Sequence, residues 1–299
     1  MIEKFDPAEV FRLIEREKVR NCSLVPTMAT ALVNCPDRPK YDLSSLKRIT
    51  IGGAASSPTL VREVEEKIGC ACFSGYGLTE TAPVLTTSRM KNGVQWEGQE
   101  RYEGQARTGY AIPGVEIRVV DAEGRDVPRD GKSIGEIAAR SDGVMAGYWK
   151  QPESTAAVIR EGWFYTGDMA TMDEYGYVLI VDRKKDIIVS GGENISSLEV
   201  EKTLLAHPAL YEVAVIPVPD ERWGEAPKAL AVLKPGAQAT EDELLEFCRG
   251  RLAHYKCPRS VEFVETLPKT GTGKILKKEL RKKYWSETET IRPELATKK

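Results

Sequence analysis

The first hundred residues alternate between short apolar runs and longer stretches with helical spacing. Short apolar runs predict buried strands at residues 22–25, 47–51 and 71–73. Helical spacing and N-capping residues predict helices at residues 7–19, 28–33 and 58–68, capped by Asp6, Thr27 and Ser57. This alternation of short strands and helices is typical of a parallel βα sheet.

The pattern then changes twice along the chain. Residues 81–111 are expected to be loop-rich, and period-two alternation predicts a small antiparallel module with strands at residues 115–120, 133–139, 163–171 and 177–181. Beyond it, helices are expected at residues 198–205, 241–252 and 275–285, and strands at 212–218 and 230–233. The pattern therefore indicates three packed regions, followed by a polar tail at 286–299.

Charge and composition exclude several classes of function. The 43 basic and 45 acidic residues are well mixed and give a net charge of −2, which argues against nucleic-acid binding. No apolar run approaches the length of a transmembrane helix, and the N-terminus has no apolar signal-peptide core. Six cysteines without a disulfide-like spacing suit a reducing compartment, so we expect a cytoplasmic protein without a transmembrane segment. Cys70 and Cys72 share one face of a strand, which indicates packing or, alternatively, a metal pair.

Four short motifs carry the candidate chemistry, and they occur in a fixed order. They are Tyr76-Gly77-Leu78-Thr79-Glu80, Tyr165-Thr166-Gly167-Asp168, Asp182-Arg183-Lys184-Lys185-Asp186 and Leu267-Pro268-Lys269-Thr270-Gly271-Thr272-Gly273-Lys274. In this order and at these separations the chain resembles the adenylate-forming superfamily, which includes acyl-CoA synthetases, peptide-synthetase adenylation domains and luciferases. The resemblance covers nearly the whole chain.

The resemblance implies the domain organisation in more detail. The fold class is then α/β and α+β: a partial βα sheet region of the large domain (1–110), its antiparallel β module (111–181), a hinge (182–186), and a mobile C-terminal α+β domain (187–285). Family members carry a Gly/Ser/Thr-rich phosphate loop far upstream of the Tyr-Gly-x-Thr-Glu motif, and the 75 residues before Tyr76 contain none. The chain is thus expected to lack that part of the large domain. Apolar strands near residues 24–25 and 49–51 are then expected to lack their cover.

Lys274 is the first candidate catalytic residue. Its surroundings do not form a Walker A loop, because Pro268 stands in place of the first Gly and Ile275 in place of Ser/Thr. The resemblance implies that Lys274 spans the acyl carboxylate and the α-phosphate, a task that suits a compact ammonium on a long stem. The alternative is a surface lysine that opens a basic helix.

A second group of candidates follows the predicted strands. Glycines there let the backbone approach a ligand closely, and open α/β sheets bind ligands at the carboxyl ends of their strands. The resemblance implies that Tyr76 flanks adenine, that Thr79 contacts phosphate and that Glu80 reaches Mg²⁺. It assigns further lining of the nucleotide and acyl site to Gly52, Gly53, Ala54, Gly75 and Gly77.

The remaining candidates lie in the third motif and just after it. Asp168 and Arg183 match the family's ribose-binding positions; the alternative is a surface salt bridge beside a hairpin. The charged run indicates a solvated hinge between two modules, and the resemblance places its pivot at Lys185. Gly191 and Gly192 match the glycine turn that lines the pantetheine tunnel.

The resemblance implies an acid–thiol ligase that uses ATP, Mg²⁺ and coenzyme A. A fatty or aryl acid would form acyl-AMP and then pass to CoA. Two alternatives stay open: a fragment without catalysis that binds nucleotide or another protein, and a carrier-protein ligase. A separate N-terminal half is a further expected partner.

Overall fold

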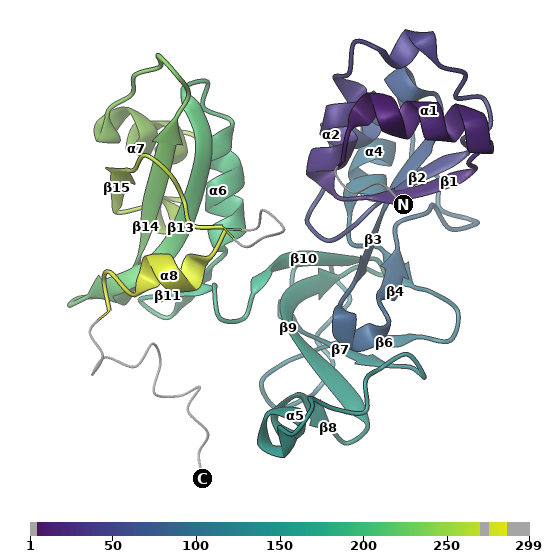
Figure 1. Ribbon diagram of the computed structural model, residues 1–299. Helices are drawn as coiled ribbons and strands as arrows, with labels where there is room; N and C mark the ends of the chain where they lie inside the picture. Colours follow the sequence, from purple (N-terminus) through teal and green to yellow (C-terminus); the bar gives the residue numbers. More distant parts are fainter. Residues whose placement is uncertain (1–4, 270–274, 286–299) are drawn as a thin grey trace. The chain divides into compact units, whose positions relative to one another are not determined.

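The computed structural model describes residues 5–269 and 275–285. The chain divides into two compact units, Met1–Ile180 and Val181–Lys299, and each is described here by itself (Figure 1). None of the described helices is long and apolar enough to cross a membrane. Together the units confirm the predicted mixture of α/β and α+β structure.

The first unit begins with a five-stranded sheet in the order β1-β2-β3-β4-β5. Its strands are β1 (Asn21–Leu24), β2 (Arg48–Ile51), β3 (Ala71–Gly77), β4 (Val84–Thr87) and β5 (Tyr110–Ala111). The β1, β2 and β3 strands are parallel, and β4 and β5 run antiparallel to their neighbours. The three predicted strands are therefore confirmed, although β3 continues four residues beyond residue 73.

Four helices accompany this sheet: α1 (Pro7–Glu17), α2 (Pro26–Val33), α3 (Pro58–Glu63), which continues as a π-helical turn at Val64–Ile68, and α4 (Gly98–Ala106). Asp6 and Ser57 accept hydrogen bonds from the backbone N–H groups of Glu9 (2.8 Å) and Leu60 (3.1 Å), as expected for N-caps. The expectation for Thr27 was wrong, because α2 already starts at Pro26, whose fixed φ suits the first turn.

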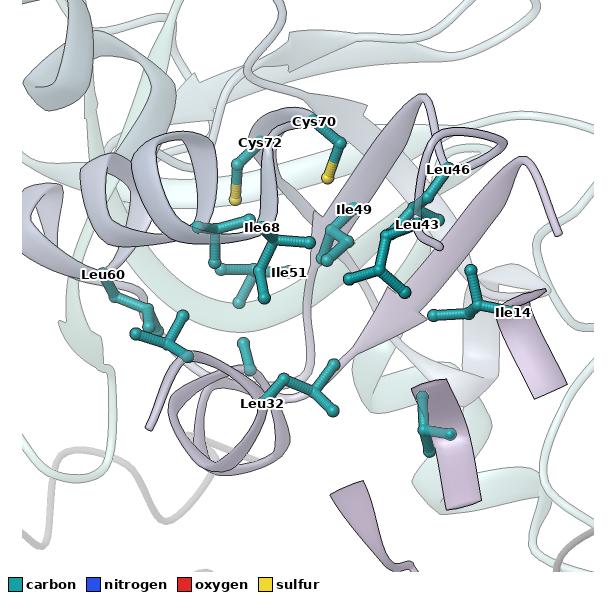
Figure 2. Close-up of a cluster of buried hydrophobic side chains, with 14 of the residues drawn as sticks. Ile14, Leu32, Leu43, Leu46, Ile49, Ile51, Leu60, Ile68, Cys70 and Cys72 are labelled. Carbon is teal, nitrogen blue, oxygen red and sulfur yellow. The ribbon is translucent and has the colours of Figure 1, made fainter. Parts of the chain in front are cut away.

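The core of this region lies between the helices and the parallel strands (Figure 2). Ile49 and Ile51 of β2 are fully buried against side chains such as Ile14 and Leu32. The expectation that these strands lack cover was therefore wrong for residues 49–51, because helices of the same unit shield them. The loop-rich expectation for residues 81–111 was wrong in part, since β4 and α4 lie there.

A second, antiparallel sheet completes the first unit. Its strands are β6 (Glu116–Val120), β7 (Gly135–Arg140), β8 (Ile159–Arg160), β9 (Trp163–Met172) and β10 (Val178–Arg183), and α5 (Pro152–Val158) precedes β8. The last three residues of β10, from Val181 on, already belong to the second unit. The order is β10-β9-β7-β6, with β8 paired to β9. The predicted hairpin of residues 163–171 and 177–181 corresponds to β9 and β10.

The second unit packs helices on a mixed sheet. Its strands are β11 (Ile188–Ser190), β12 (Glu193–Ile195), β13 (Leu210–Asp220), β14 (Gly224–Leu233) and β15 (Ser260–Phe263), and its helices are α6 (Ser197–Leu205), α7 (Glu241–Arg249) and α8 (Lys277–Arg281). The strand order is β12-β11-β14-β13, and β15 runs parallel to β14. The long antiparallel hairpin of β13 and β14 forms the central pair of strands in this unit.

We expect Ile49→Ala to lower the free energy of unfolding of the first unit by about 2–5 kcal/mol, because it opens a cavity in a fully buried site. Urea unfolding followed by tryptophan fluorescence measures this change. The control is Leu179→Ala, at a side chain that is 45% exposed. An equal loss in both variants would show that the β2 core does not carry this stability.

Candidate functional site

Small residues lie where β2 and β3 end, and we call Gly52, Gly53, Ala54 and Gly75 the glycine shelf. Ile51 pairs with Ser74, so Gly52 and Gly75 follow side by side on the two parallel strands. A Cβ atom on Gly52 would lie 3.1 Å from the carbonyl oxygen of Gly75, tighter than most real contacts. Gly53 has a φ of 79°, and Ala54 is exposed. The backbone of these residues is thus accessible at the carboxyl edge of the sheet, where ligands of open α/β sheets bind.

The turn after β3 is fixed by its own side chains. A Cβ on Gly77 would lie 1.6 Å from the carbonyl oxygen of Pro83, so no other residue fits there. Thr81 accepts a hydrogen bond from the backbone N–H of Leu78 at 3.0 Å and donates to the Pro83 carbonyl at 2.9 Å. With the turn fixed by these hydrogen bonds, Thr79 lies exposed at the start of a short 3₁₀ turn (Thr79–Thr81).

Tyr76 joins the two sheets of the first unit. Its half-buried ring packs against the core of the antiparallel sheet, which includes Ile137 and Met172. Its hydroxyl donates a hydrogen bond to Asp168 Oδ2 at 2.6 Å. The structure therefore brings together two predicted site residues that lie 92 positions apart in the sequence.

A bulge in β9 sets the position of Asp168. Glu136 pairs with Met169 while Ala138 pairs with Tyr165, so β9 has two extra residues at this point. Gly167 adopts a φ of 73° there, and its N–H donates to Glu136 Oε1 at 3.0 Å. Asp168 itself is only 3% exposed, although charged groups are seldom buried unless other groups satisfy them.

Glu80 is held by a residue that the sequence analysis did not identify as part of the site. The Tyr148 hydroxyl donates to Glu80 Oε1 at 3.0 Å, and the Met145 N–H donates to the Glu80 carbonyl at 2.8 Å. Burial, and secondarily the bond to Glu80, raises the pKa of Tyr148, so its hydroxyl stays a donor at neutral pH. Among the described residues no three His, Cys, Asp or Glu side chains gather to bind a metal. A single carboxylate fits Mg²⁺, which commonly takes one or two carboxylates together with substrate phosphates.

The predicted glycine turn lies in the second unit. Gly191 and Gly192 join β11 to β12, and both have positive φ values of 60° and 87°, as a two-residue hairpin turn requires. The Gly191 N–H donates to the Trp223 carbonyl at 2.9 Å. A Cβ on Gly191 would lie 2.5 Å from the Trp223 ring, so this turn accepts only glycine there.

The charged run at residues 182–186 is not uniformly solvated, and that expectation was wrong for its two carboxylates. Asp182 and Asp186 are buried, at 1% and 9% exposure, while Arg183 and Lys185 are exposed. Asp182 accepts hydrogen bonds from its neighbours' N–H groups and from a serine hydroxyl, which offsets the loss of water.

Three predictions concern positions that these contacts do not test. Lys274 lies outside the described residues; its flanks pair, since Leu276 N–H donates to the Pro268 carbonyl at 2.8 Å. Asp168 belongs to the first unit and Arg183 to the second, so their ribose pair stays a prediction. Lys185 also stays a predicted pivot.

The cysteine pair favours packing over metal binding. Cys70 and Cys72 are buried in the core beside β2 (Figure 2). Burial raises the pKa of Cys70 to about 12 and raises that of Cys72 further, so both stay protonated thiols at neutral pH.

Two family models match the chain. The model described as AMP-binding enzyme matches residues 1–149, and the model of the AMP-binding enzyme C-terminal domain matches residues 199–274. The second match includes Lys274, and the first includes Tyr76 and Glu80.

Similar proteins have full-length chains about twice as long. The chain is 43% identical to feruloyl-CoA synthase of an Amycolatopsis species and 40% identical to 4-hydroxybutyrate–CoA ligase 2 of Metallosphaera sedula. Each match covers 94% of this chain and 55% or 51% of the relative. The ATP-bound crystal structure of MatB from Rhodopseudomonas palustris is similar with a TM-score of 0.81 at 35% identity, covering 95% of this chain and 54% of that one. The chain therefore spans about half the length of the curated relatives it matches.

We expect Tyr76→Phe to destabilise the first unit by about 1–3 kcal/mol, because the buried Asp168 carboxylate loses a donor. Urea unfolding monitored by circular dichroism measures the change. Tyr175→Phe, at a 52% exposed ring, serves as the control and should shift the midpoint little. Unchanged stability in Tyr76→Phe would mean that this hydrogen bond does not hold the two sheets together.

Proposed function

Because this chain belongs to the AMP-binding enzyme family, we propose that it is part of an ATP-dependent ligase that activates a carboxylic acid and transfers it to coenzyme A. The observation that carries the proposal is the Tyr76–Asp168 pair at the carboxyl end of β3, beside the glycine shelf. A flat aromatic ring and a carboxylate that lie next to exposed backbone suit adenine and ribose.

The reaction has two steps. A carboxylate oxygen attacks the α-phosphorus of ATP, and the bond to pyrophosphate breaks, which gives acyl-AMP. The thiolate of CoA then attacks the acyl carbon, and AMP leaves with the electrons of the bond that breaks. Neither step needs a covalent enzyme intermediate, so catalysis consists of positioning and electrostatic stabilisation.

We assign roles to this chain's residues as follows. Tyr76 and Asp168 bind the nucleoside, with Arg183 as the second ribose contact. Thr79 contacts a phosphate, and Lys274 stabilises the charge that develops during acyl-AMP formation. Lys185 is the pivot between the two half-reactions, and Gly191 and Gly192 line the path of the pantetheine arm.

Glu80 would hold Mg²⁺, which when bound neutralises charge on the phosphates. Its Oε1 accepts the Tyr148 hydroxyl bond, so the carboxylate is oriented before any metal binds. Tyr148 thus acts through Glu80 as a positioning residue.

The acid is proposed by chemical class only. The two relatives named above act on an aryl acid and a short hydroxy acid, according to their names. We propose a fatty or aryl acid. A second candidate function is nucleotide binding without turnover, because the Tyr76–Asp168 pair and the glycines beside it serve binding by themselves.

Acid-dependent pyrophosphate release, measured with ATP, Mg²⁺ and a panel of fatty and aryl acids, tests the function directly.

In an active protein, Lys274→Ala should lower acyl-AMP formation roughly 10²-fold, while transfer of supplied acyl-AMP to CoA largely survives. Lys278→Ala, at an exposed lysine of α8, is the matched control. Equal loss of both half-reactions in Lys274→Ala would refute the assigned role. Nucleotide binding without any pyrophosphate release would favour the second candidate.

We expect Tyr148→Phe to weaken metal-dependent nucleotide binding roughly 10-fold, because the Glu80 carboxylate loses the bond that orients it. Electron paramagnetic resonance of Mn²⁺ in the presence of ATP reports this without any turnover. ATP affinity measured without a divalent cation should stay unchanged. Equal Mn²⁺ affinity in wild type and Tyr148→Phe would remove Tyr148 from the site.

A further inference from the structure

The second unit buries charged side chains that the proposed reaction does not use. Lys277, at the start of α8, lies with its Nζ 2.7 Å from Glu201 Oε1, and both side chains are 11% exposed. The same Nζ donates to Ser197 Oγ at 2.6 Å, and Ser197 in turn donates to Asp182 Oδ2 at 2.7 Å. The start of α8 is thereby linked to the first residue of the 182–186 segment.

A second buried pair lies at the end of the same helix. Arg281 Nη1 lies 2.5 Å from Asp186 Oδ1, and the two side chains are 6% and 12% exposed. The same nitrogen donates to the backbone carbonyl of Lys185 at 3.2 Å. The helix therefore contacts Lys185 and Asp186 directly and is linked to Asp182 through Ser197.

These buried contacts are expected to add little net stability to the fold. Charges that are removed from water lose hydration, and the attraction within a buried pair often does no more than offset that loss. Burial raises the pKa of both Asp182 and Glu201, although Lys277 acts in the opposite direction, which reflects this cost. The Arg281 Nε is buried and has no hydrogen-bond partner among the described residues. A helix of five residues also has little stability of its own.

Fixed geometry is the property that such contacts do provide. A well-packed apolar contact tolerates sliding, whereas a bond from Arg281 to both a carboxylate and a carbonyl specifies one position. Ile275 lies two residues before the start of α8 and pairs with Lys269. Lys274 directly precedes Ile275 in the sequence, so only Ile275 and Leu276 separate it from the start of α8.

We propose that Lys277 and Arg281 are positioning residues that lock α8 to the segment 182–186, a contact set that we call the α8 clamp. The clamp consists of Lys277, Arg281, Asp182, Asp186, Glu201 and Ser197. It makes the segment around Lys185 move as one body with Ile275, the residue that follows Lys274 in the sequence. This inference rests on the proposed function for the roles of Lys185 and Lys274. The clamp itself is a property of the second unit and is testable without any activity.

The test measures a distance within the second unit. Spin labels are placed at Lys185→Cys and Lys278→Cys, both exposed positions, with the half-buried Cys22 and Cys35 replaced by serine. Double electron–electron resonance then gives the distribution of distances between the labels. We expect one narrow distribution in this reference protein, and a width about twofold larger when Arg281→Met is added, because α8 loses its anchor.

Matched variants separate positioning from a general loss of structure. Arg281→Lys keeps the charge and should restore part of the narrow distribution. Lys282→Met removes a charge from the exposed pair with Glu279 at the end of the same helix and should leave the width unchanged. If Arg281→Met unfolds the unit, Asp186→Asn gives the same comparison with a smaller change. An unchanged width in Arg281→Met, or equal broadening in Lys282→Met, would overturn the clamp.

The functional consequence has its own readout. In a protein that forms acyl-AMP, Arg281→Met should lower the rate of acyl-AMP formation about tenfold, because misplacement of the catalytic Lys274 lowers that rate. The KM for ATP should stay within about threefold, because ATP binding does not use Arg281. Transfer of supplied acyl-AMP should change less. A wild-type protein that forms no acyl-AMP would favour the second candidate function, and the spin-label result would still decide the clamp.

Discussion

The hydrogen bond from Tyr76 to the buried Asp168 is the interaction on which the first unit's site depends. It connects a strand of the βα sheet to a strand of the antiparallel sheet, and it satisfies a carboxylate that is 3% exposed. The neighbouring features serve this contact. Gly77 lets the chain turn beside Pro83, and the bulge in β9 with Gly167 sets where Asp168 lies. The site thus belongs to the junction between two sheets, and neither sheet contains it alone.

Local signals in the sequence were sufficient for most elements of the fold. Asp6 and Ser57 cap helices because their side chains satisfy N–H groups within the next turn, which needs no tertiary context. The hairpin of β9 and β10 followed from alternation and a turn rich in polar residues. The resemblance assigned Tyr76 and Asp168 to one nucleotide site; the structure shows a hydrogen bond between them, and their role in binding stays a prediction.

Long-range contacts could not be read from the sequence in the same way. Nothing local to Tyr148 says that its hydroxyl reaches Glu80, 68 positions away. The run at 182–186 looked solvated because single charges usually are, yet Asp182 and Asp186 face inward where α8 supplies cations. A helix placed beyond Lys274 therefore decides how the segment around Lys185 is held. In physical terms, burial of a charge depends on partners that only the folded chain brings near.

The most direct test of the account is a titration of the ¹⁵N-labelled chain with AMP, followed by amide chemical shifts. The account predicts that the largest changes occur at Gly75, Tyr76 and Gly77 and at Gly167 and Asp168, and that Tyr76→Phe reduces them. Because weak binding still shifts resonances in fast exchange, low affinity does not obscure the answer. Changes centred elsewhere, or no change at saturating AMP, would contradict the claim that the junction of the two sheets binds the nucleotide.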